Sequence, residues 1–279
     1  MLNNNENIKI IANTYYNKNS YFKNECVFVF TLALISPFIG LIYTISNWRA
    51  KWAKNVFWLI CVYMGAVFIY WPEGTILGDG ADGGRYALEL IEMYNNPLIS
   101  PSYILKNYLV DPKIMDLYQP YLTYILSRFT FNGHVLFTVY AIVFGYFYSR
   151  NIWYILEKIA NKKLEYLYIY IALYFLVCPI SQINGVRMWT ALHVYVYAMM
   201  PYLLERDKTK IWLLLIVPII HFSFLYVTLF AIIYIFILKI FKIEKTVIMN
   251  ISLIIFLISL FINSVNMDWV KTILEEYSP

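Results

Sequence analysis

Charged residues are scarce in this chain. Only 14% of its 279 residues are Asp, Glu, Lys or Arg, whereas a soluble domain of this size usually carries about 25%. The charges are grouped, and the apolar runs between groups are close to the roughly 20 residues that a helix needs to cross a bilayer. The shortage of charge excludes an ordinary soluble domain and predicts an all-α, polytopic transmembrane protein. The runs are Cys26–Trp48, Asn55–Pro72, Phe129–Ser149, Tyr166–Val186, Met188–Leu204, Ile211–Leu238 and Val247–Met267.

Cysteine is rare too, and the short motifs of many soluble enzymes are missing. The three cysteines lie in separate apolar runs without metal-ligand spacing, so they indicate neither a metal site nor a disulfide framework. No HExxH, P-loop, GxSxG or paired CxxC motif occurs. The polar, Asn-rich first 25 residues do not resemble a cleavable signal peptide, so the first apolar run is expected to act as the insertion signal. We expect residues 1–279 to form a single integral membrane domain.

The basic residues gather in four short segments. Short loops rich in Lys and Arg stay on the cytoplasmic side, which explains the net charge of +5 without an acidic partner such as nucleic acid. Residues 72–117 and the C-terminal tail are acidic on balance, so both are expected outside. The pattern predicts about eight crossings, with both termini outside. The basic segments hold Arg49, Lys51 and Lys54; Arg150, Lys158, Lys162 and Lys163; Arg206, Lys208 and Lys210; and Lys239, Lys242 and Lys245.

The run Ile211–Leu238 begins and ends beside basic segments, so it must leave the cytoplasm and return. Its 28 residues would form a helix of about 42 Å, which is too long for one upright span and short for two. Pro218 lies near its middle. We expect a broken, re-entrant hairpin with its tip near His221; a single steeply tilted helix is the alternative. The shorter run Tyr118–Leu126 is expected to form an interfacial or re-entrant helix at the outer face.

The first candidate site is the glycine-rich segment Gly78–Tyr86. Asp79 and Asp82 could bind a divalent cation or act as a base, and Arg85 could pair with one of them or with a phosphate. Apolar side chains follow at helical spacing from Tyr86 to Tyr94, so the carboxylates are expected near a helix N-terminus. A helix cap, a substrate contact and a metal ligand all remain open for Asp82.

The second candidate is Arg187, the only charged residue between Glu165 and Glu205. Ionisable residues beside membrane spans usually face a cavity or a partner, and Arg fits phosphate or carboxylate through two parallel hydrogen bonds. Asn184 and Gly185 predict a helix break just before it, which would add free backbone amides to an anion site. A structural ion pair with an external carboxylate is the alternative.

The third candidate is His221, at the expected hairpin tip. Histidine is the side chain best suited to proton transfer near neutral pH. Alternatively, His221 hydrogen-bonds a backbone carbonyl that the break at Pro218 exposes. His193 and His134 are weaker candidates, and His193 is expected to pack within a span.

Three motifs follow one another in a fixed order between Val56 and Leu238. They are Asp82-x-x-x-Tyr86 after the second apolar run, Asn184-Gly-Val-Arg187 opening a run that continues Met-Trp-Thr-Ala-Leu, and Ile220-His221-Phe-Ser-Phe-Leu about thirty residues later. This ordered set resembles the EpsG family of Wzy-type polysaccharide polymerases. The chain differs from that family in having no Arg in the segment Trp71–Gly78 and in ending soon after the last apolar run.

The resemblance implies a glycosyltransferase at the outer face of the cytoplasmic (inner) membrane. Such an enzyme joins polyprenyl-pyrophosphate-linked oligosaccharide units into O-antigen, capsule or exopolysaccharide, and it needs no soluble cofactor and no metal. Its partners would be the lipid-linked oligosaccharide, a chain-length regulator and a flippase. In this chain Arg187 would hold the pyrophosphate, His221 or Asp82 would be the base for the acceptor hydroxyl, and Asp79, Arg85, Tyr86 and Asn184 would line the sugar site.

Other classes of membrane protein stay open from the sequence. A flippase or transporter of the same lipid-linked sugar is the main alternative, and it would need a charged cavity that opens to both faces. A membrane acyltransferase would place its histidine near a cytoplasmic acyl donor, whereas the expected topology puts His221 outside. A non-catalytic scaffold would leave Arg187 and His221 free to vary.

Overall fold

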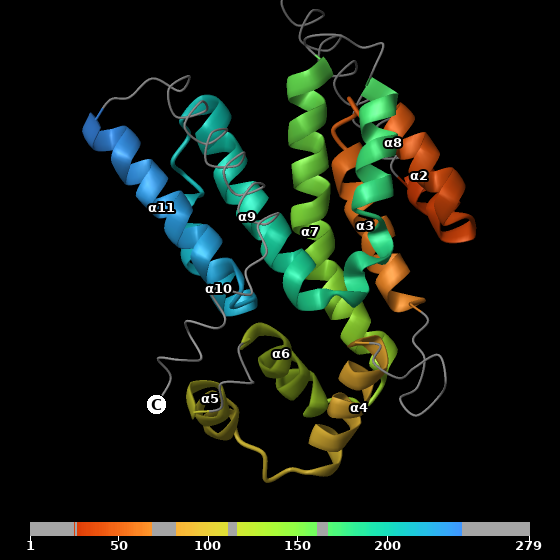
Figure 1. Ribbon diagram of the computed structural model, residues 1–279. Coiled ribbons are helices and arrows are strands. Elements are labelled where there is room, and N and C mark those ends of the chain that lie inside the picture. Colours follow the sequence, from red (N-terminus) through yellow and green to blue (C-terminus); the bar gives the residue numbers. More distant parts are fainter. Residues whose placement is uncertain (1–24, 26, 69–81, 111–115, 161–166, 242–279) are drawn as a thin grey trace, which may run out of the picture. The chain divides into compact units, whose positions relative to one another are not determined.

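The computed structural model describes residues 25, 27–68, 82–110, 116–160 and 167–241 (Figure 1). All the regular secondary structure in these ranges is helical, with no strand, so the expected all-α class is confirmed. Within them, one helix is long and apolar enough to cross a membrane, and its candidate span is Gly133–Lys158. The count of about eight crossings remains a prediction.

The first apolar run does not form one continuous helix. Residues 27–35 are helical, Ser36 is extended, and a second helix, α2 (Pro37–Ser46), starts at the proline. Proline has no N–H and cannot continue the helix before it. The chain then turns back sharply and brings Gly40 close to Ala33. A Cβ on Gly40 would lie 2.5 Å from Ala33, so only glycine fits there. The run Cys26–Trp48 was expected from its length to act as a span, and Pro37 divides it.

The buried core lies between α3 (Ala53–Ala66) and α7 (Gly133–Ala160), with α9 (Val186–Glu205) on α7 as well (Figure 1). Small residues let α3 and α7 approach closely. A Cβ on Gly65 would lie 2.6 Å from the Phe137 carbonyl oxygen, and one on Gly145 would lie 2.6 Å from Cys61 Cβ. Cys61 is fully buried there, and Cys178 belongs to the same core cluster with 9% of its surface exposed. Both therefore serve as small core residues.

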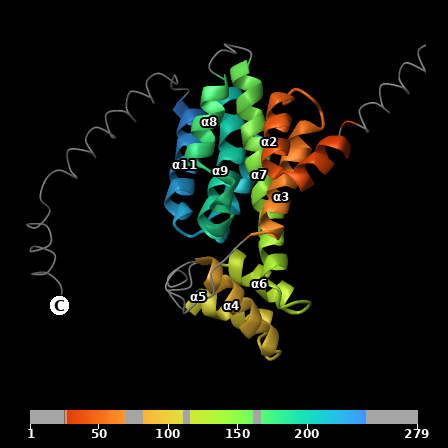
Figure 2. The ribbon, with the colours of Figure 1, turned by 90° about the vertical axis from the view of Figure 1, so that its right-hand side faces the viewer.

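Three shorter helices gather at the N-terminal end of α7. They are α4 (Asp82–Asn95), α5 (Pro101–Val110) and α6 (Tyr118–Ser127), and Figures 1 and 2 both place them together at that end. Tyr86 and Leu90, one turn apart on α4, are almost fully buried. The helical spacing that the sequence indicated after Asp82 is thus confirmed, and α6 begins at the residue where a short helix was expected.

The remaining helices are interrupted at the two places that the sequence singled out. After α8 (Leu167–Val177), the 3-10 helix η2 (Ile180–Asn184) ends at Asn184, Gly185 follows it, and α9 begins at Val186. After η3 (Ile211–Leu215) and α10 (Val217–Ile220), His221 has extended backbone angles (φ −150°, ψ 114°), and α11 (Phe224–Phe241) follows. The break near His221 is confirmed, although Pro218 lies at the start of α10 and not at the break. Whether the two arms form a hairpin remains a prediction.

The chain divides into two compact units, one ending at Thr228 and the other beginning at Leu229. Every residue of the candidate site described below belongs to the first unit.

Candidate active site

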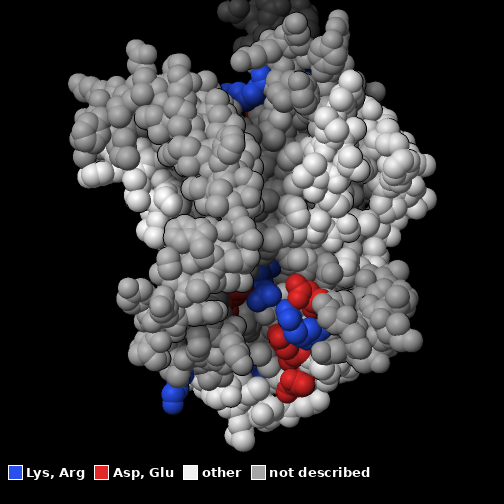
Figure 3. Space-filling model, in the orientation of Figure 1, with Lys and Arg blue, Asp and Glu red and all other residues white. Residues whose placement is uncertain are grey.

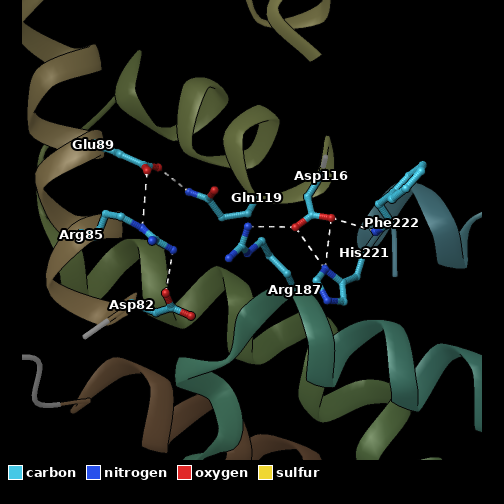
Figure 4. A network of polar contacts seen from close by, with 8 residues as sticks. All are labelled: Asp82, Arg85, Glu89, Asp116, Gln119, Arg187, His221 and Phe222. Carbon is cyan, nitrogen blue, oxygen red and sulfur yellow. Dashed lines mark hydrogen bonds and ion pairs between the residues drawn. The ribbon is translucent and has the colours of Figure 1, made fainter. Parts of the chain in front are cut away.

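One buried carboxylate, Asp116, holds together two of the residues that the sequence selected. Its side chain is 4% exposed. The Arg187 guanidinium donates to Asp116 Oδ2 at 2.9 Å, and His221 Nδ1 lies 3.1 Å from each carboxylate oxygen. The backbone N–H of Phe222 donates to Oδ1 at 2.8 Å (Figure 4). We call Asp116, Arg187, His221 and Phe222 the Asp116 cluster.

Helix ends bring the members of this cluster together. Asp116 lies just before α6, Arg187 lies in the first turn of α9, and His221 lies in the extended link after α10. The Leu117 N–H donates to the Ile219 carbonyl at 3.2 Å, which ties the start of α6 to the end of α10. Residues at helix ends have backbone groups that lack partners inside the helix, so such contacts between ends also stabilise the fold.

The contact with Asp116 fixes the roles of the two imidazole nitrogens of His221. An ionised carboxylate only accepts hydrogen bonds, so Nδ1 must carry a proton to contact it. In a neutral imidazole, Nε2 then keeps its lone pair and can accept a proton from a substrate. No described residue forms a hydrogen bond with Nε2. His221 and Asp116 are therefore arranged as a general base and the carboxylate that orients it.

Arg187 is held by Asp116 and still reaches the surface. Its side chain is 33% exposed, and only one of its nitrogens donates to the carboxylate in the described part of the chain. A guanidinium has five N–H donors, so several remain for an anion. Its central carbon also lies 6.0 Å from the centre of the Tyr86 ring. Burial raises the pKa of Tyr86, and the positive charge of Arg187 partly offsets that effect.

A second group of polar side chains lies on α4 and α6 next to the Asp116 cluster (Figure 4). Arg85 pairs with Asp82 at 2.6 Å and lies 4.0 Å from Glu89. Gln119 donates to Glu89 at 2.7 Å. Burial raises the pKa of Glu89, and the hydrogen bond from Gln119 acts in the opposite direction. We call Asp82, Arg85, Glu89 and Gln119 the Arg85 cluster.

The two clusters present charges of both signs. Figure 3 shows acidic and basic side chains gathered on one face of the molecule, in the lower half of the view. The Arg85 side chain is 46% exposed and that of Asp82 is 37% exposed. Half-exposed pairs of this kind exchange their contacts with water or a ligand at little cost. The Arg85 cluster is therefore suited to contacting a polar molecule such as a sugar.

The structure tests the placement of most of the residues predicted for the site. Arg187 and His221 meet on Asp116, Tyr86 lies beside Arg187, and Arg85 pairs with Asp82 on the same helix. Asp79 lies outside the described residues. Asn184 ends η2, and its side chain also lies outside them.

Two alternative roles from the sequence can be compared with these contacts. Asp82 is the first described residue of α4, and no group of three potential metal ligands occurs in the described ranges. His193 is 2% exposed and packs edge-on against Phe144 and Tyr148, at 5.2 and 5.0 Å between ring centres. His193 therefore packs in the core, as expected.

Asp116 itself was missed from the sequence. It is one of seven carboxylates between Glu73 and Asp116, and nothing in its neighbours distinguishes it. Its partners lie 71 and 105 residues further along the chain, so only the fold identifies it. The available signal was indirect: Arg187, predicted to lie near a span, required a carboxylate partner from an outer segment.

No family model, no curated protein and no solved structure matches this chain. The chemistry of the Asp116 cluster is the basis on which a function is proposed.

Proposed function

We propose that this protein is a membrane glycosyltransferase that joins lipid-linked oligosaccharide units into a polysaccharide. One observation carries the proposal: a single buried carboxylate positions both a histidine base and an arginine cation. Transfer of a sugar from a pyrophosphate to a hydroxyl needs these two groups, one to accept a proton and one to stabilise the departing anion.

The proposed step uses His221 and Arg187 at the same time. An acceptor hydroxyl gives its proton to His221 Nε2 while its oxygen forms a bond to the anomeric carbon of the donor sugar. The bond from that carbon to the pyrophosphate oxygen breaks, and the pyrophosphate leaves with the electron pair. Arg187 neutralises the negative charge that develops on the leaving group. Asp116 stabilises the positive charge that His221 gains.

The contacts favour His221 over Asp82 as the base. Asp82 is paired with Arg85 at 2.6 Å, so its carboxylate already has a cationic partner, whereas no described residue contacts His221 Nε2. In the proposal the Arg85 cluster contacts sugar hydroxyls instead. The long apolar helix α7 supports a membrane location, and a substrate on a polyprenyl chain would reach the site from the bilayer.

The test is a reaction with the purified full-length protein in detergent and a defined polyprenyl-pyrophosphate oligosaccharide. We expect products longer than one repeat unit with the wild-type protein and none with His221→Ala. Added imidazole is expected to restore part of the activity, because it can enter the space that the missing ring leaves. A folded His221→Ala protein with wild-type polymerisation would refute the role of His221.

A deletion strain separates the polymerase from a flippase. Loss of long surface chains with single units still displayed supports a polymerase. Loss of every unit from the surface, with lipid-linked units accumulating inside the cell, would contradict the proposal and support the flippase.

A further inference from the structure

A cavity that no part of the proposed reaction uses lies between α3, α7 and α9. Its volume is about 170 Å³, which exceeds the roughly 30 Å³ that one water molecule occupies in the liquid. It shares no residue with the Asp116 cluster or the Arg85 cluster. The lining residues that carry the argument are Lys54, Arg150, Glu157, Tyr197 and Lys210. We call this space the basic cavity.

Three cations line the basic cavity against one carboxylate. Lys54, Arg150 and Lys210 are each half-buried, whereas Glu157 is exposed. None of the three cations forms an ion pair with an acidic residue within the ranges that the structure describes. Lys210 interacts electrostatically with Asp207, whose carboxylate accepts hydrogen bonds from Thr209. The cavity therefore carries an excess of positive charge.

Two of the three cations, Arg150 and Lys210, contact neutral groups that leave donors free. Arg150 donates to Asn55 at 2.7 Å and to Ser149 at 2.9 Å, and its guanidinium lies 4.4 Å from the centre of the Tyr146 ring. Lys210 Nζ lies 4.0 Å from the centre of the Tyr197 ring. Arg has five N–H donors and Lys has three, so each side chain retains donors for an anion.

The same cations come from three of the four basic segments of the sequence. Lys54, Arg150 and Lys210 lie far apart along the chain, and the fold gathers them at one cavity. A second cavity, of about 340 Å³, adjoins it and shares Lys54 and Glu157; Arg49 and Lys51 add further positive charge there. Half-buried cations without carboxylate partners repel one another, and a bound anion removes that cost.

We propose that the basic cavity binds a phosphate group, either on the headgroup of an anionic lipid or as free phosphate. A phosphate accepts hydrogen bonds from Lys and Arg at once, and these charge-assisted bonds are stronger than neutral ones. If the basic segments face the cytoplasm, the cavity lies at the level of the inner leaflet, where anionic headgroups are found. The site is distinct from the proposed catalytic site and does not depend on it.

The test measures thermal unfolding of the full-length protein in uncharged detergent by tryptophan fluorescence. Three probes are titrated separately at constant ionic strength: phosphatidylglycerol, inorganic phosphate and phosphatidylcholine. A ligand of the folded state raises the unfolding temperature with its concentration, which gives its Kd. We expect a saturable increase with phosphatidylglycerol and none with phosphatidylcholine, because the choline cation of that headgroup neutralises its phosphate.

Two double variants with the same change of charge make the comparison specific. Lys54→Gln with Lys210→Gln removes two cations from the cavity, and Lys106→Gln with Lys208→Gln removes two exposed cations elsewhere. The cavity variant is expected to bind phosphatidylglycerol at least about tenfold more weakly, and the control variant as tightly as wild type. If the cavity variant does not fold, each single cavity variant should bind about threefold more weakly.

The probes also separate the two sources of phosphate. Stabilisation by phosphatidylglycerol alone indicates a lipid headgroup, and stabilisation by both anionic probes indicates that the phosphate group is itself sufficient. Stabilisation by inorganic phosphate alone indicates a soluble ligand. The proposal is overturned if neither anion stabilises the protein, if phosphatidylcholine acts as strongly, or if the cavity and control variants respond alike.

Discussion

Replacing Asp116 with Asn separates the positioning of His221 from the stability of the fold. The amide oxygen can still accept the hydrogen bond from the Phe222 N–H, which now measures 2.8 Å. The amide NH2 group, however, must face Arg187 or His221, both of which donate to Asp116 now. The variant keeps the shape of the side chain and loses its two charge-assisted contacts.

The cost in stability is expected to be modest. A hydrogen bond to a charged group contributes about 1.5–3 kcal/mol. Arg187 is 33% exposed, so water replaces part of what it loses, and the sum for both contacts is about 2–3 kcal/mol. Such a loss lowers the unfolding temperature and leaves the protein folded at room temperature, provided that its stability is in the usual range of about 5–15 kcal/mol.

The cost in rate is expected to be much larger. An Asn NH2 group that donates to Nδ1 moves the imidazole proton to Nε2, which removes the lone pair that accepts the substrate proton. The same change of carboxylate to amide lowers kcat about 10⁴-fold in serine proteases. We expect a decrease of about 10³-fold or more in kcat for polymer formation, with KM little changed because in the proposed step Asp116 contacts Arg187 and His221 and not the substrate.

The assay compares initial rates and unfolding temperatures for wild type, Asp116→Asn and Glu92→Gln. Glu92 is an exposed carboxylate on α4, so its variant has the same change of charge without touching the cluster, and it should behave as wild type. A folded Asp116→Asn protein with kcat within about threefold of wild type would refute the tautomer argument, since the expected effect is far larger.

Three further perturbations test other parts of the structure. Arg187→Lys keeps the charge but cannot contact Asp116 and a pyrophosphate through one planar fork, so kcat/KM should fall about 100-fold in the same assay; unchanged kinetics would contradict the proposed clamp. Burial raises the pKa of Glu89, so its contribution to stability is complete at acidic pH and is lost as the pH rises through the folded pKa. The free energy of unfolding of Glu89→Gln, relative to wild type, should therefore increase from about pH 4 to pH 8, and a constant difference would argue against the burial effect. Gly65→Leu would force a side chain against the Phe137 carbonyl, 2.6 Å from the new Cβ, and should lower the free energy of unfolding by about 1–3 kcal/mol; Ala66→Leu, at an exposed position of the same helix, is the control and should change it little.

The sequence predicted the local breaks of the chain well. Asn184 and Gly185 predicted a helix break before Arg187, and η2 ends at that place. The position of Pro218 between two basic segments predicted a break near His221, and His221 has extended backbone angles. Gly185 lies directly at the first break, between η2 and α9, whereas Pro218 lies at the start of α10 and precedes the second break by less than one helical turn.

Predictions that depended on run length alone were weaker. The run Cys26–Trp48 has the length of a span, yet Pro37 ends the helix before it, and Gly40 allows the chain to turn back. The length of a run without charges indicates how much apolar surface the segment has. The position of Pro37 determines where the helix within this run ends. The sequence contained this signal, since Ser36–Pro37 lies near the middle of the run.

The partner of Arg187 could not be predicted, because the choice among carboxylates is made by tertiary structure. The sequence allowed Arg187 to pair with any carboxylate of the outer segment. In the fold, Asp82 is occupied by Arg85 three residues away, and Asp116 is brought to Arg187 by the link between α6 and α10. Residues near in sequence form local pairs, as Asp82 and Arg85 do. Arg187 then pairs with Asp116, which the packing of helix ends places beside it.

The two charged regions lie at opposite ends of α9, and their separation supports treating them as different sites. Arg187 lies in the first turn, and the residues of α9 that line the basic cavity extend to Pro201. At 1.5 Å per residue these positions are about 20 Å apart along the helix, and no charged residue lies between them. A substrate at the Asp116 cluster and a phosphate in the basic cavity can therefore be bound together without contact. Any effect of one on the other would have to act through the helices between them, either along α9 or along η3 and α10, which connect Lys210 to His221.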